Sequence, residues 1–399
     1  MDDTRRVLLL CGYRVTDRRT GVTLLGATGS IGRSTLRVVA RHPDRFRIVA
    51  LTAARRAESL DALALDVNPE FVVLARGQST EFEPRWTGEW RYGPEHLAAA
   101  AAGVESGIVV NALVGYAGLE STLAALRSGR RLALANKESL VAGGELVLEA
   151  WRAGGGELVP VDSEHSAIHQ CLVGRPTEEV SRLILTASGG PFRSLPADRF
   201  ASIKPEDALA HPTWSMGDKI TVDSATLANK ALEVIEAHLL FGVPYDRIDV
   251  VVHPPSIVHS FVEFRDGSTI AQMGHPSMEV PILYALAAPE RLPNEFRSFD
   301  PIADGPLEFE PVREAEFPMF RLGVAAGRAG GTQPAAYNAA NEIAVRAFLD
   351  HELSFPGIAA VVETVLTEME PRPVRSLEDV EAVDLEARAR AREAARNLS

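Results

Sequence analysis

Short, mainly apolar runs alternate with longer segments of helical spacing over the first 160 residues. The runs cover residues 22–25, 46–51, 71–74, 108–110, 132–134 and 158–161. Continuous apolar runs of this length are typical of strands buried on both faces of a sheet. Segments rich in alanine and leucine separate them. This alternation predicts an α/β domain over residues 1–160, with a doubly wound parallel sheet of the Rossmann type.

The pattern changes after residue 160. Residues 161–286 mix helices with strands such as 250–253, which predicts an α+β domain. Residues 287–311 contain five prolines and many acidic residues, as a linker does. From 312 to 399 only helical spacing remains, and it predicts a helical bundle. Residues 1–20 precede the first strand, and we expect either a disordered extension or an artefact of start-site choice.

Composition narrows the possible partners. A chain of 399 residues can bury more than one core, and its net charge of −13 argues against nucleic acid. Two cysteines without a disulfide framework indicate a reducing compartment. The longest apolar run near the N-terminus, residues 7–10, is too short for a signal or membrane helix. We therefore expect a cytoplasmic protein without a membrane partner.

A glycine-rich turn joins the first strand to the first helix. Residues 26–32 read GATGSIG, with glycines three residues apart. Glycines allow a pyrophosphate to approach the backbone, and the helix N-terminus supplies amide donors, so this segment predicts a nucleotide site. The alternative is an ordinary tight turn.

The end of the second strand indicates which nucleotide binds. An acidic residue there would bind a free ribose 2′-hydroxyl, but Arg55 and Arg56 stand in that region. Guanidinium groups pair with a 2′-phosphate, so the sequence favours NADPH over NADH. The alternative is a solvated basic turn.

Two acidic clusters suggest a metal site. Asp162 and Glu164 follow the apolar run 158–161, and at a strand end residues i and i+2 point to the same side. Asn229 and Glu233 share a helical face with Lys230 beside them, although an isolated pattern of this kind is more often a solvated surface. Three carboxylates form an all-oxygen site that suits Mg²⁺ or Mn²⁺. Zinc is not favoured, because the two cysteines have no ligand spacing.

In this order, the motifs resemble those of the 1-deoxy-D-xylulose 5-phosphate reductoisomerases over nearly the whole chain. The resemblance rests on GATGSIG at 26–32, ANKESLVAGGEL at 135–146, VDSEHSAI at 161–168, TASGGPFR at 186–193, the block 211–238 and PAAYNAANEIAVRAFL at 334–349. It implies an NADPH- and Mg²⁺- or Mn²⁺-dependent oxidoreductase. Such an enzyme rearranges and reduces the phosphorylated sugar 1-deoxy-D-xylulose 5-phosphate to 2-C-methyl-D-erythritol 4-phosphate, on the methylerythritol phosphate route to isoprenoids. It also implies a homodimer. On the sequence pattern, we expect residues 161–286 to be the catalytic and metal- and substrate-binding domain.

The resemblance further implies a role for individual residues. Catalytic groups would be Lys137, Glu164 and His211, and metal ligands would be Asp162, Glu164 and Glu233. NADPH contacts would be Thr28, Gly29, Ser30, Ile31, Ala54, Arg55, Arg56, Asn136, Glu138, Met216 and Gly217. Substrate contacts would be Lys137, Ser163, Glu164, Ser188, His211, Trp214, Ser224, Asn229, Lys230 and Glu233, with Trp214 on a mobile loop.

Some alternatives and departures stay open. Lys137 could cap a strand end and His211 could be a loop hydrogen bonder. Ser277 and Glu279 replace the aspartate and arginine common in the family, so lid behaviour and substrate affinity could differ. Rival functions are an NADPH-dependent oxidoreductase with another phosphorylated substrate and a non-catalytic regulator that binds NADPH or a metal.

Overall fold

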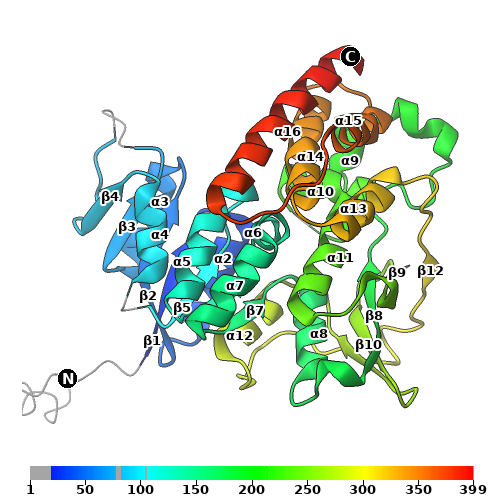
Figure 1. Ribbon diagram of the computed structural model, residues 1–399. Coiled ribbons are helices and arrows are strands. Elements are labelled where there is room, and N and C mark those ends of the chain that lie inside the picture. The colour runs from blue at the N-terminus through cyan, green and yellow to red at the C-terminus, as the bar shows by residue number, and fades with distance from the viewer. Residues whose placement is uncertain (1–18, 78–81, 104–105, 215, 399) are drawn as a thin grey trace, which may run out of the picture.

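A parallel sheet forms the first part of the computed structural model, which describes residues 19–77, 82–103, 106–214 and 216–398 (Figure 1). Its strands are β1 (Thr20–Leu25), β2 (Phe46–Ala53), β3 (Phe71–Leu74), β4 (Glu89–Tyr92), β5 (Ile108–Asn111), β6 (Arg131–Leu134) and β7 (Leu158–Pro160). Their order is β4-β3-β2-β1-β5-β6-β7, and every neighbouring pair is parallel. The chain changes direction across the sheet between β1 and β5, which confirms the doubly wound fold. The extension predicted at residues 1–20 lies almost entirely outside the described residues.

Helices cover both faces of this sheet because its strands are apolar on both sides. Adjacent residues Leu24 and Leu25 of β1 point into two different cores. The core with Leu24 includes α2 (Ser30–Arg41), α3 (Ala57–Val67) and α12 (Glu279–Ala287). The core with Leu25 includes α4 (Glu95–Ala102), α5 (Leu119–Arg127), α6 (Lys137–Gly143) and α7 (Glu145–Gly154).

Helix α12 joins the first sheet from far along the sequence. Ile282 and Leu283 are buried in the same core as α2, although they follow the second sheet in the chain. Glu279, at the start of α12, pairs with Arg37 at 2.6 Å and also with Arg41, both on α2. Helix α12 therefore packs with the nucleotide domain, although residues 279–286 fall in the range expected for the second domain and residue 287 in the expected linker.

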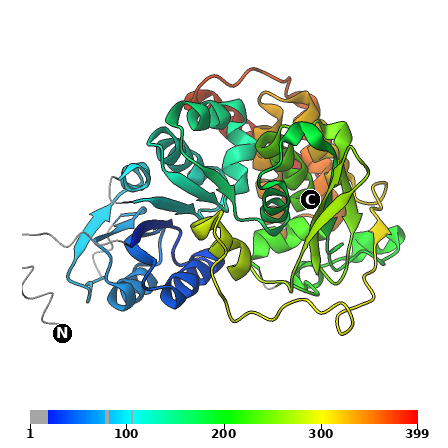
Figure 2. The ribbon, with the colours of Figure 1, turned by 90° about the horizontal axis from the view of Figure 1, so that it is seen from below.

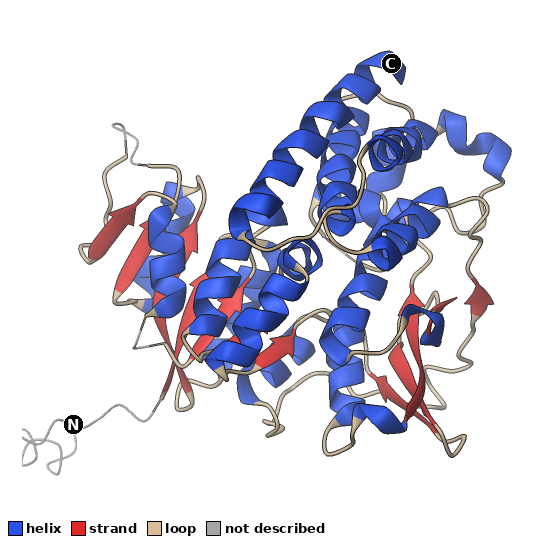
Figure 3. Ribbon diagram, in the orientation of Figure 1, coloured by secondary structure: helices blue, strands red, loops and turns tan. Residues whose placement is uncertain are grey.

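A second, mixed sheet carries the middle of the chain (Figure 3). Its strands are β8 (Val180–Ala187), β9 (Ile248–Val252), β10 (Val258–Phe264), β11 (Thr269–Met273) and β12 (Glu310–Pro311), in the order β11-β10-β8-β9-β12. The helices of this region are α8 (Ser163–Leu172), α9 (Pro205–Leu209), α10 (Asp218–Thr226) and α11 (Ala228–Phe241). Helix α8 packs on β10 and β11.

The C-terminal residues form the expected helical bundle. Its helices are α13 (Pro318–Ala329), α14 (Gln333–Leu349), α15 (Phe355–Glu368) and α16 (Leu377–Leu398). Helix α14 packs against both α15 and α16 and also touches α6 and α10, so the bundle borders the parts of the chain that carry the candidate site. The proline-rich residues before it run as an extended strap from α12 to β12, seen in yellow in Figure 2.

Candidate active site

Two buried lysines hold the three predicted metal-ligand carboxylates together. Lys137, at the start of α6, contacts Asp162 and lies 3.3 Å from Oε1 of Glu233. Lys230, in the first turn of α11, lies 2.7 Å from Oε1 of Glu164 and also contacts Glu233. Three elements distant in sequence, α6, the start of α8 and α11, therefore meet at one point. The structure brings the predicted carboxylates into one cluster.

Burial and charge set the protonation of this cluster. Burial alone would lower the pKa of Lys137, but the carboxylates of Asp162, Glu233 and Glu236 outweigh it and raise that pKa well above its usual value. Burial would raise the pKa of Glu164, but Lys230 outweighs it and lowers the pKa to about 2. Burial raises the pKa of Asp162 to about 6, against the opposing effect of Lys137. Lys137 and Glu164 are therefore charged at neutral pH.

Residues 162–164, which were expected at the end of a strand, instead begin a helix. Asp162 is the N-cap of α8, and Ser163 and Glu164 lie in its first turn. The alternation of a strand therefore does not apply, and the argument that residues i and i+2 share a side was wrong. Helical geometry still serves the site, because the helix N-terminus favours carboxylates. Ser163 also donates a hydrogen bond of 2.6 Å to Oε2 of Glu164.

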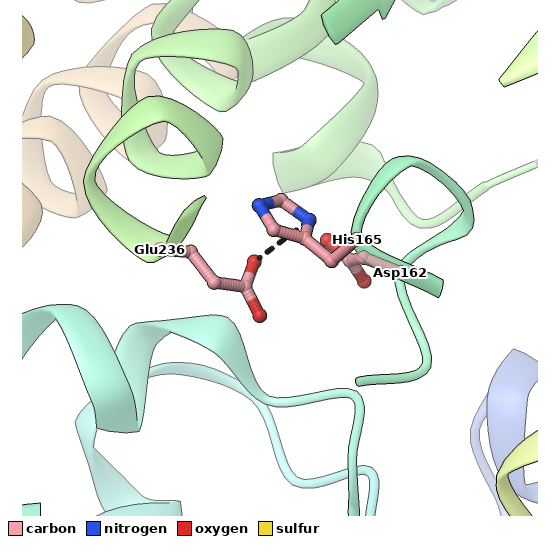
Figure 4. Close-up of side chains that lie close together, drawn as sticks. All are labelled: Asp162, His165 and Glu236. Atoms are coloured by element: carbon pink, nitrogen blue, oxygen red, sulfur yellow. Dashed lines mark ion pairs between the residues drawn. The ribbon is translucent and has the colours of Figure 1, made fainter. Parts of the chain in front are cut away.

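A second possible metal cluster lies directly beside the first (Figure 4). Ligand atoms of Asp162, His165 and Glu236 lie within 4.8 Å of one another. Nε2 of His165 faces the carbonyl of Glu233 at 2.8 Å and must donate to it, so Nδ1 of the neutral ring is an acceptor facing Glu236 at 3.3 Å. Burial raises the pKa of Glu236 well above its usual value, which favours a carboxylic acid there. Asp162 belongs to both clusters, whereas Glu164 and Glu233 lie outside this second one.

Four segments bring polar side chains together near Lys230, whose Nζ contacts the carbonyl oxygen of Thr186 at the end of β8. Ser188 follows β8 and faces Nε2 of His211 at 3.0 Å. Gly190 fits closely against the end of α10, where a Cβ would lie 2.9 Å from the carbonyl oxygen of Ser224. Leu227, with φ of 62°, makes the turn from α10 into α11, which begins with Asn229 and Lys230 in its first turn. The polar residues of these segments, Ser188, His211, Ser224 and Asn229, are partly exposed.

The ring of His211 has a defined orientation. Its Nδ1 accepts hydrogen bonds from the backbone amides of Thr213 and Trp214, at 3.1 and 2.9 Å. Burial lowers the pKa of His211, so the ring is neutral at neutral pH and carries its proton on Nε2. That nitrogen therefore donates to Ser188. The same contacts fix the backbone of Thr213 and Trp214 beside the ring.

The glycine turn between β1 and α2 has the close backbone approach expected of a phosphate site. Gly26 has φ of 82°, and a Cβ there would lie 2.5 Å from the carbonyl oxygen of Ala112. A Cβ on Gly32 would lie 2.6 Å from the carbonyl oxygen of Ala27. The N-cap of α2 is Gly29, and no side chain caps the helix there. Backbone amides of this helix are thus open to an anion, next to Thr28, Ser30 and Ile31.

The predicted arginines border this turn. Ala54, Arg55 and Arg56 follow β2 and are exposed, and Arg56 donates a hydrogen bond of 3.2 Å to the carbonyl oxygen of Thr28. The two arginines therefore lie beside the turn at the carboxyl end of β2, which is where this fold places the adenosine ribose.

The remaining predicted cofactor residues lie at the starts of α6 and α10. Asn136 is fully buried, and its amide donates to the carbonyl oxygen of Gly115 at 2.9 Å and to Glu138 at 3.1 Å. Gly217 is the N-cap of α10, with Met216 just before it. Lys219, which the sequence did not single out, lies 3.5 Å from Glu138. His165 and Glu236 were also missed, although Glu236 follows Glu233 at helical spacing.

Comparisons with known proteins assign the family. Two models for 1-deoxy-D-xylulose 5-phosphate reductoisomerase and its C-terminal domain match residues 22–144 and 158–241, and a model for the DXP reductoisomerase C-terminal domain matches 273–390. A curated relative of the same name from Rhodococcus jostii is 51% identical over 385 residues, covering 96% of each chain. The chain belongs to the 1-deoxy-D-xylulose 5-phosphate reductoisomerase family. Another relative, from Ralstonia nicotianae, is 49% identical over 93% of this chain and 96% of its own length.

Solved structures of the family share the whole fold. The reductoisomerase of Zymomonas mobilis in complex with NADPH is 42% identical, with a TM-score of 0.89, and the match covers 95% of this chain and 100% of that chain. A DOX-P reductoisomerase in complex with NADPH, fosmidomycin and magnesium is 38% identical, with a TM-score of 0.90 and coverage of 95% and 99%. Within the described residues, no helix is both long and apolar enough to cross a membrane.

Proposed function

We propose that this chain rearranges and reduces 1-deoxy-D-xylulose 5-phosphate to 2-C-methyl-D-erythritol 4-phosphate, using NADPH and Mg²⁺ or Mn²⁺. The observation that carries the proposal is the meeting of Asp162, Glu164 and Glu233 around Lys137 and Lys230, in a member of this family. Polar side chains near Lys230 and the glycine turn before α2 support the proposal. A non-catalytic regulator does not account for such a complete set.

The carboxylate set fits a hard divalent cation. All three donors are carboxylate oxygens, and the two ammonium groups offset two of their three negative charges. Asp162, Glu164 and Glu233 would hold the ion. A cation there polarises the substrate carbonyl as a Lewis acid, and NADPH supplies the hydride.

The glycine turn fits a dinucleotide with a 2′-phosphate. Open amides at the start of α2 would bind the pyrophosphate, and Arg55 and Arg56 would pair with the 2′-phosphate. Asn136, Glu138, Met216 and Gly217 would line the path from the turn toward the carboxylates.

The chain's own side chains would position the sugar. Lys230, Asn229, Ser224 and Ser188 would bind the phosphate, with Nε2 of His211 donating beside Ser188. The charged Nζ of Lys137 can donate a hydrogen bond to a substrate oxygen, and the ionised carboxylate of Glu164, which accepts a hydrogen bond from Ser163, can accept one from a substrate hydroxyl. Trp214 would cover the bound sugar and exclude water.

A direct assay tests this proposal. NADPH oxidation would be followed with 1-deoxy-D-xylulose 5-phosphate and Mg²⁺ or Mn²⁺, and the product would be identified by mass and NMR. We expect turnover that stops when a chelator removes the metal. Oxidation of NADPH only with a different phosphorylated sugar would favour the rival oxidoreductase. No turnover with any sugar, together with tight NADPH binding, would favour a regulator.

We also propose a homodimer and a cytoplasmic location. Strand β11 is an edge strand of the second sheet, with Met273 39% exposed, and such an edge is available to pair with another chain. Sedimentation equilibrium should give twice the chain mass, and a monomer at micromolar concentration would contradict the dimer. The cytoplasmic location is supported by the cysteine content, and Cys171 is buried and unpaired.

A further inference from the structure

A buried ion network connects the cofactor side of the site to the C-terminal bundle. Lys219, in the first turn of α10, is 22% exposed, and its Nζ lies 2.7 Å from Oδ2 of Asp223 and 3.5 Å from Oε1 of Glu138. The other oxygen of Asp223 accepts a hydrogen bond of 2.8 Å from Asn341 on α14. One ammonium group therefore links α6, α10 and, through Asp223, α14.

The nearer acceptor of this ammonium group, Asp223, lies with its partner Asn341 in the interior. Asp223 is 1% exposed and Asn341 is fully buried. Burial would lower the pKa of Lys219, but Asp223, Glu138 and Glu342 outweigh it and raise the pKa above its usual value. Glu342 also pairs with Arg388 of α16 at 2.6 Å, so the surrounding acids belong to three different helices. Lys219 thus holds together carboxylates that would otherwise repel one another.

Glu138 is the residue that links this ion network to the predicted NADPH contacts. Its second oxygen accepts from Asn136, and both residues match cofactor positions of the family. Between them lies Lys137, which contacts Asp162 and Glu233. A displacement of Glu138 would therefore disturb the cofactor contacts and the lysine of the carboxylate cluster together.

We propose that Lys219 is a positioning residue that, by binding Glu138 and Asp223 at once, fixes the segment Asn136–Glu138 for NADPH against α10 and the C-terminal helix α14. The inference rests on the proposed function, because it assumes that this segment contacts NADPH. Lys219 itself is not assigned to contact the cofactor or the sugar. Its effect would pass through Glu138, so it should appear mainly in NADPH affinity.

Two variants separate positioning from simple stability. Lys219→Met removes the ammonium group and leaves Asp223 buried without its charge partner, which should also lower the melting temperature. Lys219→Met/Asp223→Asn removes that buried charge and can keep the hydrogen bond from Asn341, while Glu138 still lacks its partner. Lys219→Arg keeps the charge. Arg346→Met is the control, because it breaks an exposed pair with Asp350 on the same helix α14.

The measurement is the Kd of NADPH for each purified full-length variant by calorimetry, with its melting temperature. We expect Lys219→Met to raise Kd about tenfold, the effect typical of losing a supporting contact to a binding residue. The double variant should recover melting temperature but not Kd, Lys219→Arg should stay within about threefold of wild type, and Arg346→Met should match it. In steady state, the KM for NADPH should rise more than the KM for the sugar phosphate.

The outcomes are distinct. Wild-type Kd in a folded Lys219→Met chain, or recovery of Kd with stability in the double variant, would overturn the positioning role. If Lys219→Met does not fold, the double variant and Lys219→Arg decide the question alone. A wild-type chain that fails to bind NADPH would contradict the proposed function, and this inference with it.

Discussion

Glu233 is the residue on which the charge balance of the site depends. It is 2% exposed and contacts both lysines, Lys137 through one oxygen and Lys230 through the other. Asn229 also donates to it from one turn earlier in α11. A carboxylate with three such donors is fixed in place before a ligand binds. Less side-chain entropy is then lost when the ligand binds.

Replacing Glu233 with glutamine should therefore weaken the metal site specifically. Glu233→Gln keeps the size of the side chain but removes one negative charge from the oxygen donors, so metal affinity and turnover should fall together. Calorimetric titration with Mn²⁺ and the NADPH assay would measure both, while NADPH binding should be unchanged. Full activity of this variant after treatment with a chelator would rule out the proposed ligand set.

The arginines after β2 should decide the choice of cofactor. Replacing Arg55 and Arg56 together with alanine should weaken NADPH binding by roughly 2–4 kcal/mol and leave NADH binding nearly unchanged, because only NADPH carries the 2′-phosphate. Binding of each cofactor can be followed by fluorescence titration. Equal losses for NADPH and NADH would contradict the assignment.

Single residues were predicted best where a motif combined several residue types. GATGSIG, VDSEH and the N-K-x-x-E pattern located the turn and the carboxylates. His165, Glu236 and Lys219 were not singled out, because their significance depends on partners from other helices. A lysine among acidic residues in a helix looks like a solvated face until packing shows that Lys219 is mostly enclosed.

At the level of elements, the glycine turn after β1 packs tightly against neighbouring backbone, and this limits which residues can occupy it. Gly26 and Gly77 have almost the same φ, 82° and 81°, but their surroundings differ. A Cβ on Gly26 would strike the backbone of Ala112, whereas a Cβ on Gly77 would meet nothing within 4 Å. Comparing substitutions at Gly26 and Gly77 therefore distinguishes the cost of a positive φ from the cost of a steric clash.

Alanine at these two glycines should therefore give unequal losses. Gly77→Ala has only the left-handed backbone to accommodate and should lower the free energy of unfolding by about 1 kcal/mol. Gly26→Ala must also move β1 away from the neighbouring backbone, and should lose about 3 kcal/mol and most NADPH binding. Urea denaturation would compare them. Equal losses would mean that the turn can relax around the added methyl group.

Helices and strands were predicted correctly where the hydrophobic spacing was uniform. Prediction failed at the start of α8 and for the packing of α12. Six of the seven strands of the first sheet, and the helical nature of the C-terminal residues, were expected from spacing alone. Strand β4 was missed, because its sequence EWRY has no apolar run. The start of α8 was misread, because an apolar run followed by Asp-Ser-Glu suits a strand end as well as a helix cap. The packing of α12 on the first sheet could not be inferred, since spacing does not reveal which core a helix joins.

At the scale of the whole molecule, the predicted phosphate contacts come from two separate regions. Ser188 follows a strand of the second sheet, whereas Ser224, Asn229 and Lys230 lie around the α10–α11 turn, so one anion could bridge the two regions. Binding energy from a remote phosphate can then hold the closed arrangement and orient the ketone. The phosphate should accordingly influence turnover as well as affinity.

Replacing Lys230 tests whether the substrate phosphate contributes to turnover as well as to affinity. Lys230→Ala should lower kcat/KM by more than about 100-fold, on the order of 3 kcal/mol, without changing NADPH binding. The unphosphorylated sugar should react slowly even at saturation. A normal turnover number with only a raised KM would show that the phosphate serves for capture alone.

The late position of α12 in the chain has a consequence for synthesis on the ribosome. One face of the nucleotide domain is completed by Ile282 and Leu283 and by the pairs of Glu279 with Arg37 and Arg41. A nascent chain that has released only its first 160 residues would therefore expose an apolar surface until more than a hundred further residues emerge. Folding of this domain cannot be completed in the order of translation, and chaperones that bind apolar surfaces would find it uncovered during that interval.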